Sequence, residues 1–418
     1  MVKRWPMSGF KPWSSTPPER RTKGDVLAAV AIVAVVAVSA TLIWWTSDAR
    51  ATVSRPAASP VPALKLAKAV PTSLKQLWTA PSPKTTRPVV VAGSVVTGDG
   101  HQVDGRDPGT GAVLWSYARD ADLCGLTSVY EDAVAVYPDA RGCGQVSTID
   151  AKTGRRDATR TSYSDAPVHL STDGTTVLSY GATRLEQWRS DMVRMLSWGA
   201  LDARIKPKVP IQPLCRLVSA KASPSAVSVL ESCPGQTSPR LTLLRADKDE
   251  DEPLVKYVQL PGVPNDDSAR VIAVNGTTTA IYVPKPQPVV NVIDESGTLT
   301  VSTLMPKPAS PLAVPSHPDD DLVTWWTGDS VMVFAANGLR YKYTVSPTGG
   351  QAPVGPATIM AGKLLVPVST GYDVFDPETG AGVGHLPVTR PPSTAAIVPA
   401  VAGSTVLEQR GDTLVALG

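Results

Sequence analysis

Residues 89–117 read VVVAGSVVTGDGHQVDGRDPGTGAVLWSY, and this stretch predicts four short strands. Two β-branched runs, 89–91 and 95–97, flank a Gly-Ser turn, a third run precedes residues 107–111, and a fourth covers 112–117. Four antiparallel strands in about 30 residues form a sheet that cannot bury both of its faces alone. The fold therefore depends on repetition of this unit.

The turn before the fourth strand carries a D-x-x-T-G signature. The Asp107 carboxylate can accept backbone N–H groups two residues on, and Gly111 can supply the positive φ that closes the hairpin. The signature returns at 150–154 and 376–380, with a looser version at 294–297. Self-similarity of this kind indicates a repeat architecture.

The composition agrees with a repeat protein and excludes one class of partner. The chain has 418 residues, 42% hydrophobic and 18% charged, with 40 Pro, 32 Gly and only three Phe, which is too long for one ordinary compact core. Its net charge of +3 is small, and its basic residues are scattered. We therefore expect no nucleic-acid partner.

The N-terminal region predicts a membrane anchor. Residues 1–25 are polar and basic, and residues 26–45 contain no charge, which is enough for a helix to cross about 30 Å of hydrocarbon. Trp44 and Trp45 lie at its far end, where indoles favour the interface, and the preceding positive charges favour a cytoplasmic N-terminus. We expect a cytoplasmic tail (1–25), a transmembrane signal anchor (26–45) that binds the membrane, and an extracytoplasmic remainder.

A cleaved signal peptide is the alternative, because Ala49-Arg50-Ala51 resembles a cleavage site. The apolar stretch is longer than is usual for such peptides, so the uncleaved anchor is favoured. Residues 46–73 are rich in Pro, Ala and Ser and predict an extended linker. The folded module is expected at 74–418.

Aligning the four-run pattern predicts eight units, with seven as the alternative because the repeats are irregular in the middle and least secure after residue 300. The last unit, 396–417, supplies only three strands, and residues 74–80 (LKQLWTA) supply the missing one, with Leu77-Trp78 standing as Leu114-Trp115 does in the first unit. Shared terminal strands would close the repeats into a ring without open edges. The predicted units are 88–119, 124–162, 167–204, 215–261, 270–305, 322–350, 357–388, and 396–417 with 74–80.

The four-strand repeat, the D-x-x-T-G turn and the Leu-Trp pair resemble the quinoprotein-type, or PQQ-like, β-propeller repeat. The resemblance covers 74–418 and is clear at 88–119, 146–162 and 371–418. It implies an all-β fold, an eight-bladed or alternatively seven-bladed propeller of four-stranded antiparallel blades, here preceded by one transmembrane helix. The family includes alcohol dehydrogenases and also non-catalytic envelope proteins, such as the propeller subunit of the outer-membrane β-barrel assembly machinery.

An enzyme of this family would be expected to hold a quinone cofactor and calcium through carboxylates, an Asn and a base Asp, beneath a disulfide between adjacent Cys. No two Cys are adjacent here, and the other residues match no position, so catalysis does not carry over. No metalloprotease, hydrolase, phosphate-loop or calcium-loop motif is present. We therefore expect no catalytic residue, no cofactor and no metal.

The four Cys form two pairs with nearly equal spacing, Cys124/Cys143 and Cys215/Cys233, at similar places in the second and fourth units. Of three possible connectivities we predict these two local disulfides, each stabilising by roughly 3 kcal/mol and both typical of an oxidising exterior compartment. Free thiols remain the alternative, and a zinc site is disfavoured because there is no C-x-x-C.

Structural rather than functional roles are favoured for the other polar and aromatic residues. Solvated loops are favoured over metal sites for 247–252 and 319–321, and Trp115, Trp188 and Trp198 are expected to pack between blades. Adjacent Trp325 and Trp326 face opposite sides of a strand, so one is a candidate for exposure. Turn or strand-edge roles are expected for the four His, which are His101, His169, His317 and His385.

These features predict a single-pass, membrane-anchored propeller that binds proteins or acts as a scaffold in a bacterial cell envelope, with envelope or membrane proteins as partners. The alternatives are a membrane-tethered quinoprotein-like oxidoreductase and an extracellular sensor of glycans or other ligands. Fold-level analogy supplies the scaffolding role, which is weaker support than a site.

Overall fold

The computed structural model describes residues 22–200, 215–250, 252–315, 321–391 and 395–418. It divides into two compact units, Met1–Ala51 and Thr52–Gly418. Most of the basic tail predicted at 1–25, and the acidic pair at 319–320, lie outside the described residues.

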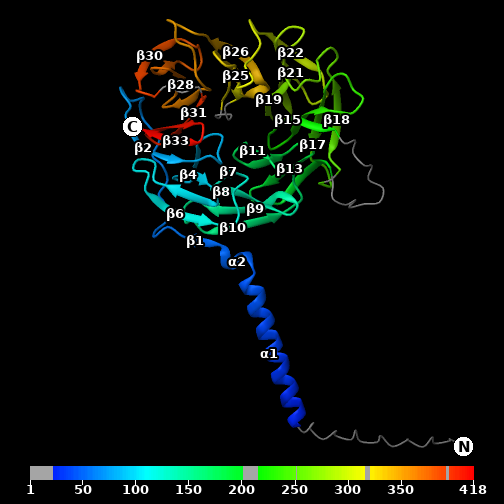
Figure 1. Ribbon diagram of the computed structural model, residues 1–418. Coiled ribbons are helices and arrows are strands. Elements are labelled where there is room, and N and C mark those ends of the chain that lie inside the picture. Colours follow the sequence, from blue (N-terminus) through cyan, green and yellow to red (C-terminus); the bar gives the residue numbers. More distant parts are fainter. Residues whose placement is uncertain (1–21, 201–214, 251, 316–320, 392–394) are drawn as a thin grey trace, which may run out of the picture. The chain divides into compact units, whose positions relative to one another are not determined.

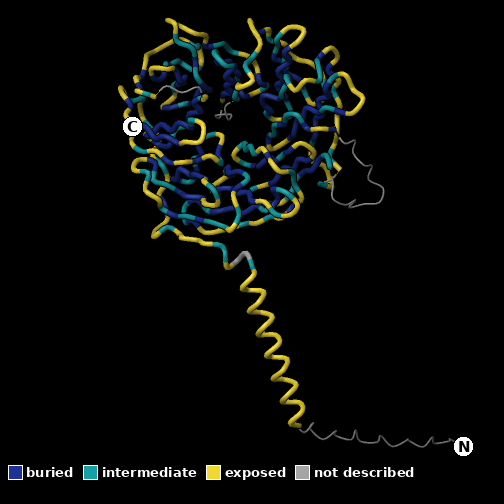
Figure 2. The backbone as a smooth tube through the Cα atoms, in the orientation of Figure 1, coloured by how far each residue is buried: buried dark blue, intermediate teal, exposed yellow. Residues whose placement is uncertain are grey.

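The first unit contains helices α1 (Lys23–Trp45) and α2 (Asp48–Ala51). Helix α1 begins three residues before the uncharged stretch because Thr22 and Asp25 form a capping box, in which the Asp25 N–H donates to the Thr22 hydroxyl at 3.2 Å and the Thr22 N–H donates to the Asp25 carboxylate at 2.8 Å. No residue of α1 is buried (Figure 2). At 23 residues the helix is long and apolar enough to cross a membrane.

The second unit is an all-β propeller of eight blades, as predicted, and the seven-bladed alternative is excluded (Figure 1). Seven blades have four antiparallel strands and blade 1 has a fifth. Within blades 1 to 7 the chain runs from the axis outward, so the first strand of each blade lines the centre and the last forms the rim. The first strands of blades 1 to 5, 7 and 8 contact their neighbours around the axis, in the blade pairs 1 and 2, 2 and 3, 3 and 4, 4 and 5, 7 and 8, and 8 and 1.

The first four blades lie in chain order. Blade 1 comprises β3 (Val89–Val91), β4 (Ser94–Asp99), β5 (Gln102–Arg106) and β6 (Val113–Ala118); blade 2, β7 (Gly125–Val129), β8 (Asp132–Asp139), β9 (Gly142–Asp150) and β10 (Arg156–Thr161); blade 3, β11 (His169–Thr172), β12 (Thr176–Tyr180), β13 (Arg184–Arg189) and β14 (Arg194–Gly199); blade 4, β15 (Arg216–Ala222), β16 (Val227–Ser232), β17 (Arg240–Arg245) and β18 (Leu254–Gln259).

The remaining blades follow the same order until the ring closes. Blade 5 comprises β19 (Arg270–Asn275), β20 (Thr278–Val283), β21 (Val289–Ile293) and β22 (Leu299–Leu304); blade 6, β23 (Val314–Pro315), β24 (Leu322–Trp326), β25 (Val331–Ala335) and β26 (Arg340–Val345), with a 3-10 turn at Asn337–Leu339; blade 7, β27 (Thr358–Met360), β28 (Lys363–Val368), β29 (Gly371–Phe375) and β30 (Gly382–Pro387); blade 8, β31 (Ile397–Ala402), β32 (Thr405–Arg410), β33 (Thr413–Leu417) and β2 (Gln76–Pro81).

Strand β2 completes blade 8 from the opposite end of the propeller sequence, which confirms the predicted closure. It pairs antiparallel with β33, with Trp78 opposite Ala416 and Ala80 opposite Leu414. The Thr85 hydroxyl donates to the Gln409 side-chain oxygen at 3.1 Å, and this buried bond joins the approach to blade 1 to the second strand of blade 8. The ring is therefore closed by strand pairing and by a polar contact beside it.

The segment expected as a free linker is partly bound to the propeller. Its residues 53–55 form β1 (Val53–Arg55), which pairs with the outer edge of β6. The backbone N–H groups of Ala57 and Val61 donate to Thr153 and Lys152 of blade 2, each at 2.9 Å, and Val61 is buried in the core of blade 1. Residues 52–65 are called the strap below. They differ from the extended tether that their composition predicts, because backbone hydrogen bonds and small apolar contacts bind them to the blades although they have no hydrophobic core of their own.

An aromatic ring on the rim strand of one blade stacks on the turn of the next. The Trp78 indole N–H donates to the Pro108 carbonyl and the Trp115 indole N–H to the Ala151 carbonyl, each at 2.8 Å. A Cβ on Gly111 or Gly154 would lie 2.6 Å from the Cγ of the stacked indole, so glycine is required at both positions. Tyr343 takes the same place, and its hydroxyl donates to the Pro377 carbonyl at 2.9 Å.

The D-x-x-T-G turns have the predicted geometry. The Asp107 carboxylate accepts the backbone N–H of Gly109 at 3.0 Å and of Thr110 at 2.8 Å, and Gly111 has a φ of 73°. Equivalent bonds form at Asp150 and Asp376. Each Asp therefore caps its own turn, and the Gly that ends the turn receives the ring from the preceding blade.

The four cysteines form two local disulfides. The structure bonds Cys124 to Cys143 and Cys215 to Cys233, with Cα separations of 6.0 and 4.2 Å. Cys143 lies in the third strand of its blade rather than just after the second.

Trp325 and Trp326 are both buried, at 0% and 6% exposure, so the expectation that one is exposed is wrong. A blade has neighbours on both faces, and neither face of β24 meets solvent.

Replacing Trp78 with alanine should destabilise the ring. The indole contacts Gly111 and bonds to Pro108 across the seam where the termini meet. We expect Trp78→Ala to reduce the free energy of unfolding by about 3 kcal/mol, measured by urea unfolding of the full chain in detergent. Leu77→Ala is the matched control on the same strand, because Leu77 is 46% exposed. Equal losses for the two variants would contradict the role of the seam.

Candidate functional site: the axial pocket

A pocket of about 330 Å³ lies at the axial ends of blades 7, 8, 1, 2 and 3. Its wall comes from the first strand of each of these blades and from the segment before β3. It combines aliphatic and proline residues with hydroxyls, and Tyr130 at its rim is 63% exposed. The lining residues are Arg87–Val90, Thr127, Ser128, Tyr130, Thr172, Gly174, Pro356–Ile359 and Val398–Val401.

Three cationic or basic side chains from different blades come close together near this pocket. Arg87 lines the pocket, His169 begins β11, and Lys221 lies on β15, the first strand of blade 4. Burial and then the charge of Arg87 lower the pKa of Lys221 from its usual value to about 8. Burial and then Lys221 lower the pKa of His169. Two cations, Arg87 and Lys221, and the basic His169 ring therefore lie near one another on this side of the axis.

The chemistry of this lining suits binding. Within the described part of the chain, Arg87 is the one charged residue of the pocket wall, and no carboxylate contributes to it. The Lys221 side chain forms no hydrogen bond or ion pair within the described ranges, whereas its backbone pairs with Ser228 in the sheet. The His169 ring stacks on Tyr180 with centroids 5.0 Å apart. Cations beside hydroxyls and an exposed tyrosine can hold an anionic group, whereas general acid–base chemistry requires a base positioned against a nucleophile.

A second cavity, of about 830 Å³, lies between the strap, the rim of blade 1 and the turn between the first two strands of blade 8. Its wall is mostly Pro, Ala and backbone, and its titratable residues are Lys65 and Asp107. Asp107 already accepts the bonds of its own turn. This cavity follows from the way the strap crosses the blade rims and offers fewer directed polar groups than the axial pocket.

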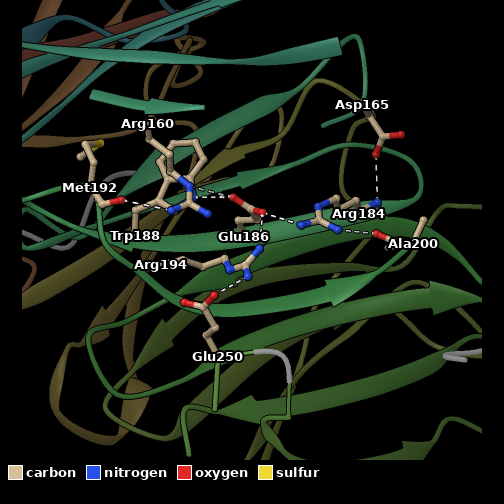
Figure 3. Close-up of polar contacts among 9 residues, drawn as sticks. All are labelled: Arg160, Asp165, Arg184, Glu186, Trp188, Met192, Arg194, Ala200 and Glu250. Atoms are coloured by element: carbon tan, nitrogen blue, oxygen red, sulfur yellow. Dashed lines mark hydrogen bonds and ion pairs between the residues drawn. The ribbon is translucent and has the colours of Figure 1, made fainter. Parts of the chain in front are cut away.

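Buried carboxylates lie on the seams between blades, and Figure 3 shows the most elaborate case. Glu186 of β13 is 3% exposed at its side chain and accepts from Arg184 at 2.6 Å and Arg194 at 3.1 Å. It also accepts from Arg160 of blade 2 at 3.2 Å. Arg194 in turn bonds to Glu250 on the loop of blade 4. One carboxylate thus links blades 2 and 3 directly, and through Arg194 the cluster reaches blade 4.

The same arrangement recurs on two other seams. Glu231 of blade 4 accepts the indole N–H of Trp198 of blade 3 at 2.8 Å, and Glu408 of blade 8 accepts the hydroxyl of Tyr372 of blade 7 at 2.6 Å. Each carboxylate is also paired with an arginine, Arg240 or Arg390. Each carboxylate accepts at least one bond from the preceding blade and further bonds from its own blade, so each cluster ties two blades together.

Burial alone would raise the pKa of Glu186, but the charges of Arg160 and Arg184 outweigh it, and the pKa lies below its usual value. Burial also acts to raise the pKa of Glu408. The Arg390 guanidinium outweighs this effect, so the pKa of Glu408 is lowered as well. Both carboxylates therefore stay ionised at neutral pH, and their negative charges balance the positive charges of the arginines.

One group in the described ranges has three metal-type ligands within reach of one another, namely Cys215, Glu231 and Cys233. The two sulfurs are bonded to each other, and the Glu231 carboxylate accepts from Arg240 and Trp198. These atoms are not available to a metal ion.

The residues singled out in the sequence are dispersed. His385 lies on the rim strand β30 with its Nδ1 2.8 Å from an Asp373 carboxylate oxygen, and His101 follows a turn of blade 1, so neither approaches His169. His317 lies outside the described residues. Within the acidic segment predicted as a solvated loop, Glu250 packs on blade 3, and its carbonyl accepts the Ser197 N–H at 2.8 Å. Sequence analysis did not identify Lys221 or Arg87 as site residues. The two residues are 134 positions apart in the sequence, and only the closed ring brings them together.

Comparison with solved structures finds similar chains. Among them are BamB from Moraxella catarrhalis, with a TM-score of 0.49 and 12% identity over 82% of this chain and 97% of that chain, and dihydro-heme d1 dehydrogenase NirN in complex with DHE, with a TM-score of 0.49 and 13% identity over 82% of this chain and 79% of that one. No protein-family model and no curated protein matches the sequence.

The residues present do not fit the quinone and calcium site that the resemblance implies for an enzyme. Calcium requires several oxygen ligands, mostly carboxylates, and the described lining of the axial pocket contains none. The four Cys form two local bridges in blades 2 and 4 rather than a bridge between adjacent Cys.

Replacing Glu186 should weaken the fold in a pH-dependent way. We expect Glu186→Gln to reduce the free energy of unfolding by roughly 3 kcal/mol at pH 7, because three arginines lose their anionic acceptor. The folded pKa is lowered, so the wild-type contribution is present above the unfolded value of about 4.5 and is lost as pH falls through the folded value.

The measurement is urea unfolding at pH 7, 5 and 3.5. The gap between wild type and Glu186→Gln should narrow at the lowest pH. Glu378→Gln is the control, because Glu378 is 74% exposed at its side chain and pairs only with Lys342 on the surface. A gap that is independent of pH would show that the charge of Glu186 does not hold the seam.

Proposed function

We propose that this protein is a membrane-anchored propeller of the cell envelope that binds other envelope proteins and takes an anionic group of a partner at its axis. The observation that carries the proposal is the pair of cations near the axial pocket, Arg87 before blade 1 and Lys221 of blade 4, with His169 of blade 3 beside them. Acidic side chains of a partner protein would complement this positive charge.

The N-terminal helix and the disulfides support the proposed location. Helix α1 has the length and composition of a membrane span, and the Arg50 guanidinium lies 4.0 Å from the Trp45 ring centroid at its C-terminal end. A cation beside indoles is typical of the membrane interface. Two disulfides are typical of an oxidising compartment, which favours a propeller outside the cytoplasm and a cytoplasmic N-terminus.

The exposed surface also supports a binding role. The buried carboxylates of Glu186, Glu231 and Glu408 are used between blades, and the axial pocket is open at the exposed Tyr130. A rigid ring with such a mouth presents a fixed surface at low entropic cost. An oxidoreductase is the second candidate, because a quinone with carboxylate groups is also anionic and would favour the same cations.

Photocrosslinking in native membranes tests the binding role. A photoreactive amino acid at Tyr130, beside the axial pocket, should give a discrete adduct with an envelope protein. The same substitution at Tyr341, which is 40% exposed on the rim strand β26, should not. Absence of any adduct specific to Tyr130 would contradict partner binding at the axis.

The charge of Lys221 should control this contact. Its pKa of about 8 means that the ammonium is present below pH 8 and lost above it. We expect the Tyr130 adduct to fall roughly five-fold between pH 7 and pH 9, corresponding to about 1 kcal/mol, and to fall equally at pH 7 in Lys221→Gln. A pH dependence that persists in Lys221→Gln would assign the effect to another group.

Thermal unfolding with added pyrroloquinoline quinone and calcium separates the second candidate. A scaffold should show no shift and no dye-linked oxidation of alcohols or sugars. A stabilising shift together with oxidation would replace the binding proposal with the enzymatic one.

A further inference from the structure

The rim strands of the propeller differ in how they are protected from edge-to-edge pairing. An exposed strand edge carries unpaired backbone N–H and C=O groups, and proteins block such edges with charges, proline, or a covering segment. Seven of the eight rim strands carry one of these devices. They are β1 over β6, Arg156 and Arg160 in β10, Arg194 in β14, Lys256 in β18, Arg340 and Lys342 in β26, Pro387 in β30, and Pro81 in β2.

The exception is β22, the rim strand of blade 5. Its sequence is Leu-Thr-Val-Ser-Thr-Leu, with no charge, proline or glycine. Leu299, Val301 and Leu304 are 53%, 40% and 64% exposed. No strand in the described ranges pairs with its outer edge. The strand therefore combines free backbone groups with apolar, β-branched side chains.

Blade 1 shows that an edge of this shape accepts another strand. In β6, Trp115 pairs with Gly105 and Val113 with Arg106, so Leu114 is an extra residue, and β1 pairs with the three residues from Ser116 to Ala118. In β22, Val301 pairs with Val292 and Leu299 with Ile293, so Thr300 is the extra residue. Ser302–Leu304 thus occupies the place on blade 5 that β1 covers on blade 1.

The free groups on β22 can be assigned from its register. The Met305 N–H donates inward to the Pro288 carbonyl at 2.8 Å. Antiparallel pairing alternates inward and outward groups, so the N–H and C=O of Ser302 and Leu304 point away from β21. Thr303 lies between these two outward residues.

This spacing suits a second copy of the same strand. A two-fold axis at Thr303 places Ser302 of one copy opposite Leu304 of the other, so the outward groups of both are satisfied in a self-complementary contact. In such a self-pairing only the residue on the axis faces its own copy, but the residues around it meet each other at close range, and like charges that face one another destabilise a sheet. The absence of charge in β22 removes that repulsion, whereas the lysines and arginines of β10, β18 and β26 would create it.

We propose that two copies of this chain associate through β22, which joins two four-stranded blades into one antiparallel eight-stranded sheet. The contact goes beyond the proposed binding function and does not depend on the axial pocket. An edge contact of this size is small, so the association is weak in dilute solution.

Cysteine crosslinking of the full chain in native membranes tests the association. All described cysteines are in disulfides, so Thr303→Cys supplies the one free thiol. Under a mild oxidant, Thr303→Cys should give a disulfide-linked homodimer on a non-reducing gel. Thr344→Cys is the matched control, because Thr344 is a partly buried threonine of the charged rim strand β26 on the next blade. The dimer yield should be at least about ten-fold higher for Thr303→Cys.

A second variant separates pairing from random collision. Leu304→Lys, added to Thr303→Cys, introduces a charge beside the two-fold axis at a side chain that is 64% exposed. Its dimer yield should fall to that of Thr344→Cys while the unfolding midpoint stays unchanged. Equal yields from Thr303→Cys and Thr344→Cys, no dimer from Thr303→Cys, or an adduct with a different protein in place of the homodimer would each overturn the proposal.

Discussion

The ladder between β2 and β33 is the interaction on which the rest of the structure depends. Trp78 opposite Ala416 and Ala80 opposite Leu414 join the two ends of the propeller sequence in one sheet. Without this ladder, blade 8 would expose an edge of three strands, and the first strands around the axis would not be held in a ring. The juxtaposition of Arg87 and Lys221 across the centre therefore also depends on this closure.

The seams between blades follow two chemical schemes. In one, the ring of Trp78, Trp115 or Tyr343 stacks on a turn glycine and donates to a carbonyl of the next blade. In the other, a buried carboxylate accepts from an aromatic or arginine donor of the preceding blade, as at Glu186, Glu231 and Glu408. Between them the two schemes give six of the eight seams a directional bond within an apolar contact, which fixes the angle between blades more specifically than apolar packing alone.

The sequence predicts the parts of the fold that rest on local chemistry. The D-x-x-T-G turn is formed by side chains within five residues, so it identifies blades directly, and the incomplete last unit indicates the shared blade. The strap escapes prediction because Pro, Ala and Ser indicate no core, while its contacts are backbone bonds to Lys152 and Thr153. Trp325 and Trp326 are both buried although adjacent side chains point to opposite faces of a strand. The prediction that one is exposed assumed that one face of the sheet meets solvent. The axial cations have no sequence signature, because blades distant in sequence bring them together.

The route of the chain into the propeller has a mechanical consequence. The covalent link from α1 to the ring passes through β1 and the strap before it reaches β2, the strand that closes the ring. Tension applied to the N-terminal helix would load the ladder of β1 on β6 and the bonds at Ala57 and Val61 first. The closing strand would thus be shielded from pulling forces, and the weakest links would detach while the ring stayed intact.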